Sequence, residues 1–394
     1  MFQRDSFRQW RNRLGVLIAL ALFTTASSSA ADAPCATDEC WPMFRGDPQL
    51  TGVARCSLPK DLAVLWTFET PEPITSTAAI VDGVVYVGSM DEYFYALDLM
   101  SGKLKWKYKA KGAVQSSPLV VGSLVVFGDE EGVIHALDRA KGEMRWTFVT
   151  DGQVISSANF YDGKILVGSY DGFLYCLAAK DGRLVWKHET DGYLHGSPSV
   201  MNGLVVAAGC DERLHVLQVS DGKPEPSVAL GSVVGASASL GGSSVFIGTY
   251  GGEVLSIDWK AKHVAWRHRD EDKEFPILAS AAITDKIVIT GGRDKTVRAL
   301  DRQTGKLLWK FVTKARVESS PVIVGERAFV GSSDGNLYSL SLKTGEKLWH
   351  YEAGSPISAS PAVAAGCLVV GTEDGLLYCF GSAAEARRPR PSRD

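Results

Sequence analysis

One position in the sequence recurs with a period of 40 residues, apart from one step of 43, and its side chain changes from copy to copy. Hydroxyl, amide, imidazole and carboxylate groups all occur there, and such groups bind small polar ligands through hydrogen bonds. The eight copies are Thr75, Gln115, Ile155, His195, Gly235, Leu278, Glu318 and Ser358. The polar copies become candidates for a ligand site if the fold brings them together. Otherwise they line a hydrated opening.

A small hydroxyl residue stands two places after each copy, and it does not vary in the same way. These residues are Thr77, Ser117, Ser157, Ser197, Ser237, Ser280, Ser320 and Ser360. A catalytic serine would not need eight copies, so we interpret them as structural residues of a crowded inner strand. His263 and His268 lack cysteine or carboxylate partners at the spacing of metal ligands. The sequence therefore predicts neither a catalytic residue nor a metal site.

Tryptophan follows the same period. Trp66, Trp106, Trp146, Trp186, Trp266, Trp309 and Trp349 each end a short alternating segment. In six units a glycine stands four residues before this position, including the one unit in which the tryptophan is missing. The glycine lies in a turn that favours a residue without Cβ. A fixed period of about 40 residues with strand-like segments predicts a β-propeller. Each tryptophan is expected to lie between neighbouring blades.

The repeat predicts an all-β, eight-bladed propeller with four short strands in each blade. Eight first strands can be counted, but only seven fourth strands follow them. Val64–Phe68 can supply the missing strand, so the N-terminal strand is expected to complete the last blade and remove an open sheet edge. We divide the chain into a signal peptide (1–31), a lead-in segment packed on the outside of the fold (32–63), the propeller (64–381) and a basic disordered tail (382–394).

Two units depart from the pattern. Lys223–Pro226 places two prolines where the other units have a strand and a tryptophan, which predicts a weakened outer strand. The 43-residue step falls in the charged segment His268–Pro276. Its residues are candidates for contact with a partner, or they form a solvated loop. The candidates are Asp270, Glu271, Asp272, Lys273, Glu274 and Phe275.

The first residues resemble a secretory signal. Arg4, Arg8, Arg11 and Arg13 precede the apolar run Leu14–Phe23, which is too short to span a bilayer as a mature helix. We therefore expect an exported protein of the periplasm or cell envelope, with no transmembrane segment after cleavage. Export permits one disulfide among Cys35, Cys40 and Cys56, whereas Cys176 and Cys379 lie in distant units and should stay unpaired. The 42 basic and 45 acidic residues argue against a nucleic-acid partner.

The segments Ala96–Trp106 and Ala299–Trp309 resemble the tryptophan motif of PQQ-type, or quinoprotein-like, propellers. The resemblance covers roughly residues 62–381 and implies the propeller fold. One branch of that superfamily comprises PQQ-dependent alcohol dehydrogenases. Membership of this branch would imply long insertions, a pair of adjacent cysteines and a set of calcium ligands. Here no two cysteines are adjacent, and no Cys-x-x-Cys-His haem site occurs. The chain more closely resembles the other branch, that of BamB, the propeller subunit of the outer-membrane β-barrel assembly machinery.

These observations favour an exported, non-catalytic scaffold that binds protein partners, and the resemblance implies a role in outer-membrane β-barrel protein assembly. No cofactor is expected. The alternative is a quinoprotein-like redox protein that binds PQQ, or a binder of another small ligand.

Overall fold

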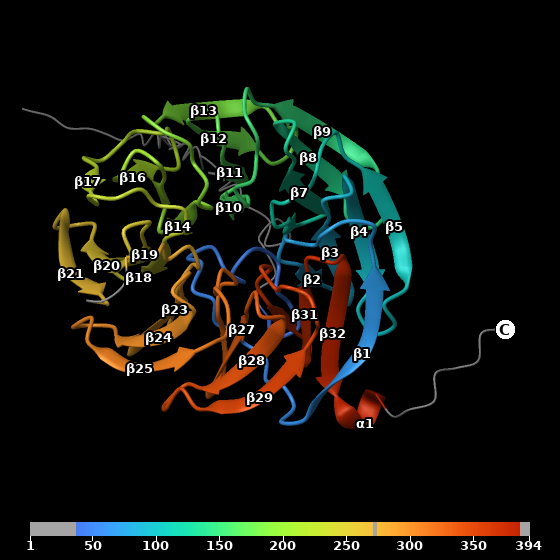
Figure 1. Ribbon diagram of the computed structural model, residues 1–394. Coiled ribbons are helices and arrows are strands. Elements are labelled where there is room, and N and C mark those ends of the chain that lie inside the picture. Colours follow the sequence, from blue (N-terminus) through green and yellow to red (C-terminus); the bar gives the residue numbers. More distant parts are fainter. Residues whose placement is uncertain (1–36, 271–273, 387–394) are drawn as a thin grey trace, which may run out of the picture.

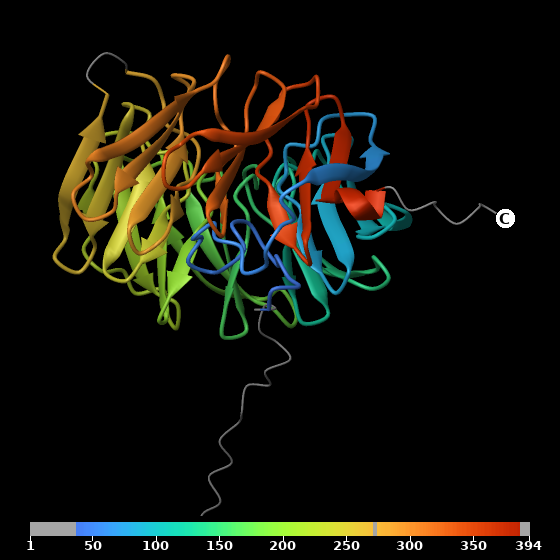
Figure 2. The same ribbon diagram turned by 90° about the horizontal axis from the view of Figure 1, so that it is seen from below.

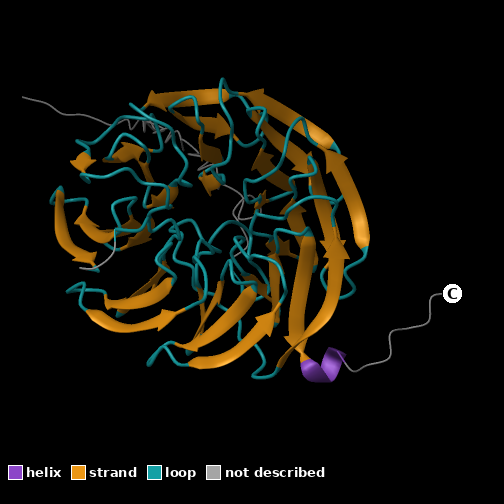
Figure 3. Cartoon of the chain, in the orientation of Figure 1, coloured by secondary structure: helices purple, strands orange, loops and turns teal. Residues whose placement is uncertain are grey.

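The computed structural model describes residues 37–270 and 274–386, which form eight four-stranded antiparallel sheets around a central channel. The sheets are arranged like the blades of a propeller (Figure 1), and this confirms the predicted fold class. Strands make up nearly all of the regular structure (Figure 3). The short helix α1 (Ala383–Ala386) follows the last strand.

The strands occur in chain order within each blade. Blade 1 contains β2 (Ala79–Val81), β3 (Val84–Gly88), β4 (Tyr93–Asp98) and β5 (Leu104–Lys109). Blade 2 contains β6 (Leu119–Val121), β7 (Leu124–Gly128), β8 (Val133–Asp138) and β9 (Met144–Val149). Blade 3 contains β10 (Asn159–Tyr161), β11 (Lys164–Gly168), β12 (Phe173–Ala178) and β13 (Leu184–Glu189). Blade 4 contains β14 (Ser199–Met201), β15 (Leu204–Ala208), β16 (Arg213–Gln218) and β17 (Val228–Ala229).

The second half of the ring repeats this order. Blade 5 contains β18 (Ser239–Gly241), β19 (Ser244–Gly248), β20 (Glu253–Asp258) and β21 (His263–Arg269). Blade 6 contains β22 (Ala282–Ile283), β23 (Ile287–Gly291), β24 (Thr296–Asp301) and β25 (Leu307–Val312). Blade 7 contains β26 (Val322–Val324), β27 (Arg327–Gly331), β28 (Asn336–Ser341) and β29 (Lys347–Glu352). Blade 8 contains β30 (Ala362–Ala364), β31 (Cys367–Gly371), β32 (Leu376–Ser382) and β1 (Leu62–Glu69).

Each blade becomes more polar from the channel outwards. The second strands, such as Val84–Gly88, are buried almost throughout because neighbouring blades cover both faces of the sheet. The fourth strands alternate between exposed and partly buried residues, as in Leu104–Lys109, because one face meets solvent. The innermost strands are short: in blade 2 the strand is Leu119–Val121. Residues 114–118 lie in the connection from the outer strand of blade 1 to blade 2.

The N-terminal strand completes the last blade, as the sequence predicted. β1 pairs antiparallel with β32, from Leu62 opposite Ser382 to Glu69 opposite Leu376. The pair shows a register shift between Val64 and Trp66. β1 therefore joins the two ends of the chain and closes the ring (Figure 1).

The repeated tryptophans lie between consecutive blades. In six of them the indole Nε1 donates to a carbonyl oxygen in the next blade, at distances from 2.7 Å for Trp66 and Leu99 to 3.1 Å for Trp106 and Arg139. The ring also lies against the repeated glycine. At Gly182, where φ is +72°, an added Cβ would lie 2.5 Å from the ring of Trp146. Trp349 instead meets Phe380 edge-on, with ring centroids 5.7 Å apart.

Blade 4 has the shortest outer strand. β17 pairs with β16 at only two positions, Leu214 with Val228 and Arg213 with Ala229. The segment containing Pro224 and Pro226 replaces the usual fourth strand, because proline cannot donate to the sheet. Pro224 makes one isolated bridge to Leu217.

The lead-in segment is not on the outside of the fold, and this expectation was wrong. Residues 38–60, here called the plug, run across one end of the channel (Figure 2). Trp41, Met43, Arg45 and Leu50 are each at most 2% exposed. Plug carbonyl oxygens accept hydrogen bonds from the innermost strands of six blades. The donors are the amides of Ile80, Val120, Val200, Leu240, Ile283 and Ile323, at 2.7–2.9 Å.

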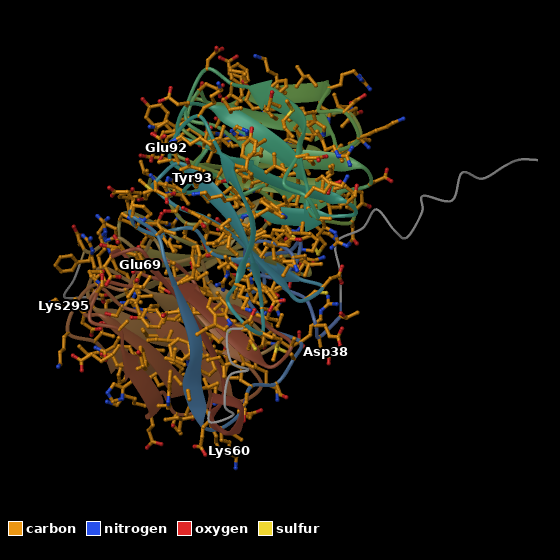
Figure 4. All side chains as sticks on the ribbon, turned by 90° about the vertical axis from the view of Figure 1, so that its right-hand side faces the viewer. Asp38, Lys60, Glu69, Glu92, Tyr93 and Lys295 are labelled. Atoms are coloured by element: carbon orange, nitrogen blue, oxygen red, sulfur yellow. The ribbon has the colours of Figure 1, made fainter. Side chains whose placement is uncertain are left out.

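The plug gives the two ends of the channel different characters. The end that it covers is called the plug face, and the opposite end is called the mouth face. Glu92 and Lys295 lie at the mouth face and Asp38 at the plug face (Figure 4). The plug satisfies inner-strand amides that would otherwise face the channel unpaired, which explains why an irregular segment can be buried there.

Other expectations about the ends of the chain are corrected or remain open. The tail was expected to begin at residue 382, but β32 includes Ser382 and α1 follows it. Cys40 is in a disulfide, whereas Cys56 is a free thiol. Cys176 and Cys379 are free, as predicted. The predicted signal peptide and Cys35 lie outside the described residues.

A second set of side chains joins neighbouring blades near the mouth face. An aromatic ring on an outer strand packs edge-on against a third-strand residue of the next blade, as Phe148 does with Tyr175 at 5.4 Å between centroids. The Tyr175 hydroxyl donates to Asp171 at 2.7 Å. Between blades 3 and 4 both rings are histidines: His188 lies 5.4 Å from His215, whose Nε2 is 2.5 Å from Asp211.

The tryptophan contacts predict a large and position-specific contribution to stability. Trp146→Ala should lower the free energy of unfolding by about 3–5 kcal/mol, because it removes a buried ring and its hydrogen bond to Ala179. Trp259→Ala is the control, since Trp259 is only partly buried and its Nε1 is 3.5 Å from the Gly242 oxygen. Urea unfolding of both variants checks this. Equal losses would contradict an interblade role.

The His188–His215 pair predicts lower stability in acid. Burial, followed by the neighbouring His215, holds the pKa of His188 below its ordinary value, although Asp211 opposes the shift. The unfolded chain, with a histidine pKa of about 6.5, then binds the proton more readily than the folded chain. The contribution of the neutral His188 to the free energy of unfolding is present above about pH 6.5. It is lost as the pH falls toward the pKa of His188 in the folded chain.

His188→Phe should therefore reduce the dependence of the unfolding free energy on pH between about 7.5 and 5.5. Phenylalanine occurs at the equivalent position, Phe148, so the packing can be retained. Part of the slope should persist, since the pKa values of His195 and His268 are also lowered by burial. His263→Phe, on an exposed position of β21, is the matched control for removal of an exposed imidazole. An unchanged slope in His188→Phe would refute the assignment.

Candidate functional site

The eight variable positions come together at the mouth of the channel. They line a pocket of about 440 Å³. The repeated hydroxyl residues and Phe44 of the plug also line this pocket. The polar candidates Thr75, Gln115, His195, Glu318 and Ser358 all belong to this lining. The sequence therefore identified one ring of the pocket, which we call the mouth pocket.

The hydroxyl residues below the variable ring link one blade to the next. The amide of Thr77 donates to the Ser117 hydroxyl at 3.0 Å, and the amide of Ser117 donates to the Ser157 hydroxyl at 2.9 Å. The same bond continues from blade to blade as far as Ser360 in blade 8. These hydroxyls accept from a buried backbone amide, which fits the structural interpretation rather than a nucleophilic role.

One half of the mouth pocket is charged. Arg293 donates to the Glu318 carboxylate at 2.6 Å, and Arg316 lies 3.4 Å from the other oxygen of that carboxylate. Gln115 hydrogen-bonds Glu130, and Glu373 adds a further carboxylate to the lining. The Ser358 hydroxyl is buried and has no hydrogen-bond partner among the described residues.

The other half of the mouth is aromatic. Tyr170 and Tyr193 stack with ring centroids 5.1 Å apart and an interplanar angle of 13°. The Tyr170 hydroxyl lies 2.5 Å from His195 Nδ1. Burial lowers the pKa of His195 and raises the pKa of Tyr170 to about 12, so both groups are neutral at pH 7. Tyr193 and Tyr250 remain 57% and 44% exposed. Tyr170, Tyr193, His195 and Tyr250 are called the mouth aromatic patch.

Sequence reasoning missed most of this patch, although a signal was present. The turn between the second and third strands also contains a variable position, occupied by Met90, Glu130, Tyr170, Cys210, Tyr250, Arg293, Ser333 and Glu373. Members of this second ring pair with members of the first. Thr75 with Met90, Gln115 with Glu130, His195 with Tyr170, and Glu318 with Arg293 are such pairs. Comparing both positions across the repeat would have identified the patch.

Asp270, Glu274 and Phe275, which are described residues of the charged segment, lie at the mouth face but outside the pocket lining. Asp270 is 3.8 Å from both Arg298 and Lys310, and Glu274 is 3.1 Å from Arg269. Phe275 is 50% exposed. The other three partner-contact candidates, Glu271, Asp272 and Lys273, lie outside the described residues.

The groups that could bind a cofactor or metal at the mouth are few. Within residues 37–270 and 274–386, no cluster of three or more histidine, cysteine or acidic side chains is arranged to bind a metal ion. The Arg293 guanidinium is already paired with Glu318, and Glu130 and Glu373 make the mouth acidic. PQQ carries several carboxylates, so the charges present at this mouth do not suit it.

Comparisons with known proteins agree with this architecture. The family model described as outer membrane protein assembly factor BamB matches residues 52–161, 153–269 and 263–384. The structure of BamB from Moraxella catarrhalis superposes with a TM-score of 0.70 at 19% identity, covering 84% of this chain and 99% of that protein. Quinohemoprotein alcohol dehydrogenase from Comamonas testosteroni gives 0.77 at 14% identity, covering 91% and 82%. These structural similarities are evidence for the fold alone.

A curated relative matches a shorter segment. Quinohemoprotein alcohol dehydrogenase ADH IIB from Pseudomonas putida is 32% identical over 88 residues, which cover 20% of this chain and 13% of the dehydrogenase. In the described part of the chain, no helix has the length and apolar character needed to cross a membrane. The three consecutive family matches together cover most of the chain. The protein therefore belongs to the family of PQQ-type propellers described as outer membrane protein assembly factor BamB.

Proposed function

We propose that this protein is a non-catalytic scaffold of the cell envelope that binds protein partners through its mouth face, in the assembly of outer-membrane β-barrel proteins. The exposed mouth aromatic patch is the observation that carries the proposal. Family membership supports the assembly role, and the signal-like sequence at residues 1–31 supports export to the envelope.

Aromatic side chains at a rigid surface are suited to protein recognition. Tyrosine is enriched among the residues that contribute most to binding energy at interfaces, because it adds a large contact area and a hydroxyl. Three tyrosines lie on three consecutive blades: the stacked pair Tyr170 and Tyr193, and Tyr250. Phe275 exposes an apolar ring on the same face. A partner that covers this surface would bury aromatic area without requiring the propeller to deform.

The charges around the patch indicate the partner's chemistry. Acidic residues occur on the mouth-face turns of blades 1 to 4 and of blade 8, and basic residues gather near blades 6 and 7. The acidic residues that reach the surface are Asp91, Glu92, Glu130, Glu131, Asp171, Glu212, Glu373 and Asp374. Asp129 and Asp211 are buried against His135 and His215. The basic residues are Arg293, Lys295, Lys314 and Arg316. A partner with basic residues over the acidic arc would be steered to this face and oriented on it.

A second candidate function is the binding of a small neutral or cationic polar ligand in the mouth pocket. The unpartnered Ser358 hydroxyl and the varied polar ring support it. PQQ-dependent redox chemistry has weaker support, because the acidic lining does not suit a polycarboxylate. A dehydrogenase site also excludes water, whereas the mouth pocket opens directly at the mouth face.

The interface proposal predicts that two side chains dominate partner capture. A Tyr193→Ala, Tyr250→Ala double variant should recover at least tenfold less of the outer-membrane assembly proteins than the unchanged chain, because each lost contact costs about 2 kcal/mol or more. Capture of the tagged chain from its own cell envelope, quantified by mass spectrometry, checks this. The control is Tyr161→Ala, since Tyr161 is 37% exposed at the plug-face end of β10.

Equal recovery by the double variant and the control would contradict the assignment of the mouth face. PQQ-dependent dye reduction by the purified chain would contradict the non-catalytic role.

A further inference from the structure

Below the variable positions of the mouth pocket lies a circle of hydroxyl groups, here called the hydroxyl ring, whose protons have no acceptor in the described protein. Seven serines of the repeated hydroxyl position each accept a hydrogen bond from a backbone amide of the preceding blade, at 2.8–3.0 Å. Each of these serines is at most 7% exposed, and each lines the pocket. A hydroxyl also has one proton to donate. Among residues 37–270 and 274–386, none of the seven hydroxyls donates a hydrogen bond.

This arrangement determines what a ligand must offer to the hydroxyl ring. Buried O–H donors are costly when they are left without an acceptor. A ligand that displaces water from such donors loses affinity unless it reproduces the hydrogen bonds of that water. A ligand of the mouth pocket must therefore present several lone pairs toward the hydroxyl ring.

The rim of the pocket makes the opposite demand, because acceptors predominate there. The Glu373 carboxylate makes no hydrogen bond or ion pair with any residue that the structure describes. The Ser358 hydroxyl is likewise without a partner in the described part of the chain. Gln115 donates its amide nitrogen to Glu130, and its amide oxygen is available to accept. The ligand must therefore carry hydrogen-bond donors as well as lone pairs.

The charges of the lining favour a neutral ligand. Arg293 is the cationic residue of the lining, and it is already paired with Glu318 at 2.6 Å. An anion would therefore meet Glu373 without gaining a free cation. A cation would pair with Glu373 but would face the O–H protons of the hydroxyl ring. A neutral ligand with several hydroxyl groups meets both demands, because each hydroxyl donates and accepts.

One wall of the pocket is aromatic because a glycine occupies the variable position of blade 5. Tyr250 lines the pocket and remains 44% exposed. An added Cβ at Gly235 would lie 2.9 Å from Tyr250 Cε2 and 3.1 Å from Leu278 Cδ2. The glycine therefore allows the tyrosine ring to lie close to the backbone of blade 5, beside an aliphatic side chain.

The aromatic wall and the hydrogen-bonding groups lie on opposite sides of the channel. Blade 5, which carries Tyr250, lies across the channel from blade 1 (Figure 1). The neighbours of blade 1, blades 8 and 2, carry Glu373 and Gln115. An aromatic wall that faces hydrogen-bonding groups suits a cyclic polyol, whose C–H face is apolar and whose edge carries hydroxyls.

We propose that the mouth pocket binds a neutral sugar of one or two rings, stacked on Tyr250 with its hydroxyls toward Glu373, Gln115 and the hydroxyl ring. The pocket volume of about 440 Å³ is within the range of small-ligand sites, about 300–1,000 Å³. The proposal rests on the second candidate function, for which it names the class of ligand.

Isothermal titration calorimetry of the purified chain with maltose, cellobiose and N,N′-diacetylchitobiose tests the proposal. At least one of these sugars should bind at one site per chain. Sorbitol has hydroxyl groups but no cyclic C–H face, so it should bind at least tenfold more weakly than the best of the three. Lysine amide, a small cation, should also bind more weakly than that sugar.

Matched variants separate stacking from charge. Tyr250→Ala should weaken binding of the sugar about tenfold, whereas Tyr250→Phe should retain it, because the ring supplies the contact. Glu373→Gln should weaken the sugar by less than tenfold, since an amide still forms hydrogen bonds. Tyr161→Ala, at the plug-face end of β10, is the control and should leave binding unchanged. Thermal unfolding confirms that each variant is folded.

Four outcomes would overturn the proposal: no binding of any of the three sugars, equal binding of sorbitol, equal affinity of the Tyr250→Ala and Tyr250→Phe variants, or tighter binding of lysine amide than of every sugar. The last outcome would assign the pocket to a cation. If one of them occurs while capture of protein partners still depends on Tyr193 and Tyr250, the sugar site alone fails and the scaffold function stands. If a sugar binds as expected while partner capture is unchanged in the double variant, the scaffold assignment fails and the sugar site stands.

Discussion

Closure of the ring between the two ends of the chain is the constraint on which the rest of the structure depends. Without β1, the β32 edge would be open and blade 8 would lack an outer strand. Trp66 would also be lost from its place against blade 1, where its Nε1 donates to Leu99 at 2.7 Å. Each blade packs on two neighbours, so one open junction would expose apolar surface on both sides of the gap.

The plug adds a second constraint at the centre. The innermost strands have a free edge toward the channel, and the plug supplies carbonyl oxygens to six of them. This arrangement buries Arg45, which is 1% exposed and donates to the Ala281 oxygen at 3.0 Å. Burial lowers the pKa of Arg45 to about 9. A buried guanidinium is costly unless its donors are paired, so the plug must gain enough from its strand contacts and apolar residues to offset that cost.

Sequence periodicity predicted the features that repeat, and it failed for features that occur once. The blade number, the closing strand and the variable mouth ring all follow from copies of one pattern. The plug could not be placed, because its hydrogen bonds are made by backbone atoms and its residues follow no strand alternation. The mouth aromatic patch is a departure within the repeat. It becomes visible only when equivalent positions are compared and the fold shows which ones face the mouth pocket.

The two faces have different chemistry as a result. The mouth face presents aromatic and charged groups on its turns, whereas the plug runs across the opposite end of the channel. This arrangement suits a scaffold that binds through its mouth face, and it requires that the plug remain seated in the folded protein.

Hydrogen exchange of the inner-strand amides tests that central requirement most directly. The amides of Ile80, Val120, Val200, Leu240, Ile283 and Ile323 donate to the plug. If the plug is permanently seated, they should exchange as slowly as amides in the buried central strands, such as those of β3. Exchange as fast as that of the mouth-face turns, while β3 stays protected, would show that the plug opens independently and would contradict the account.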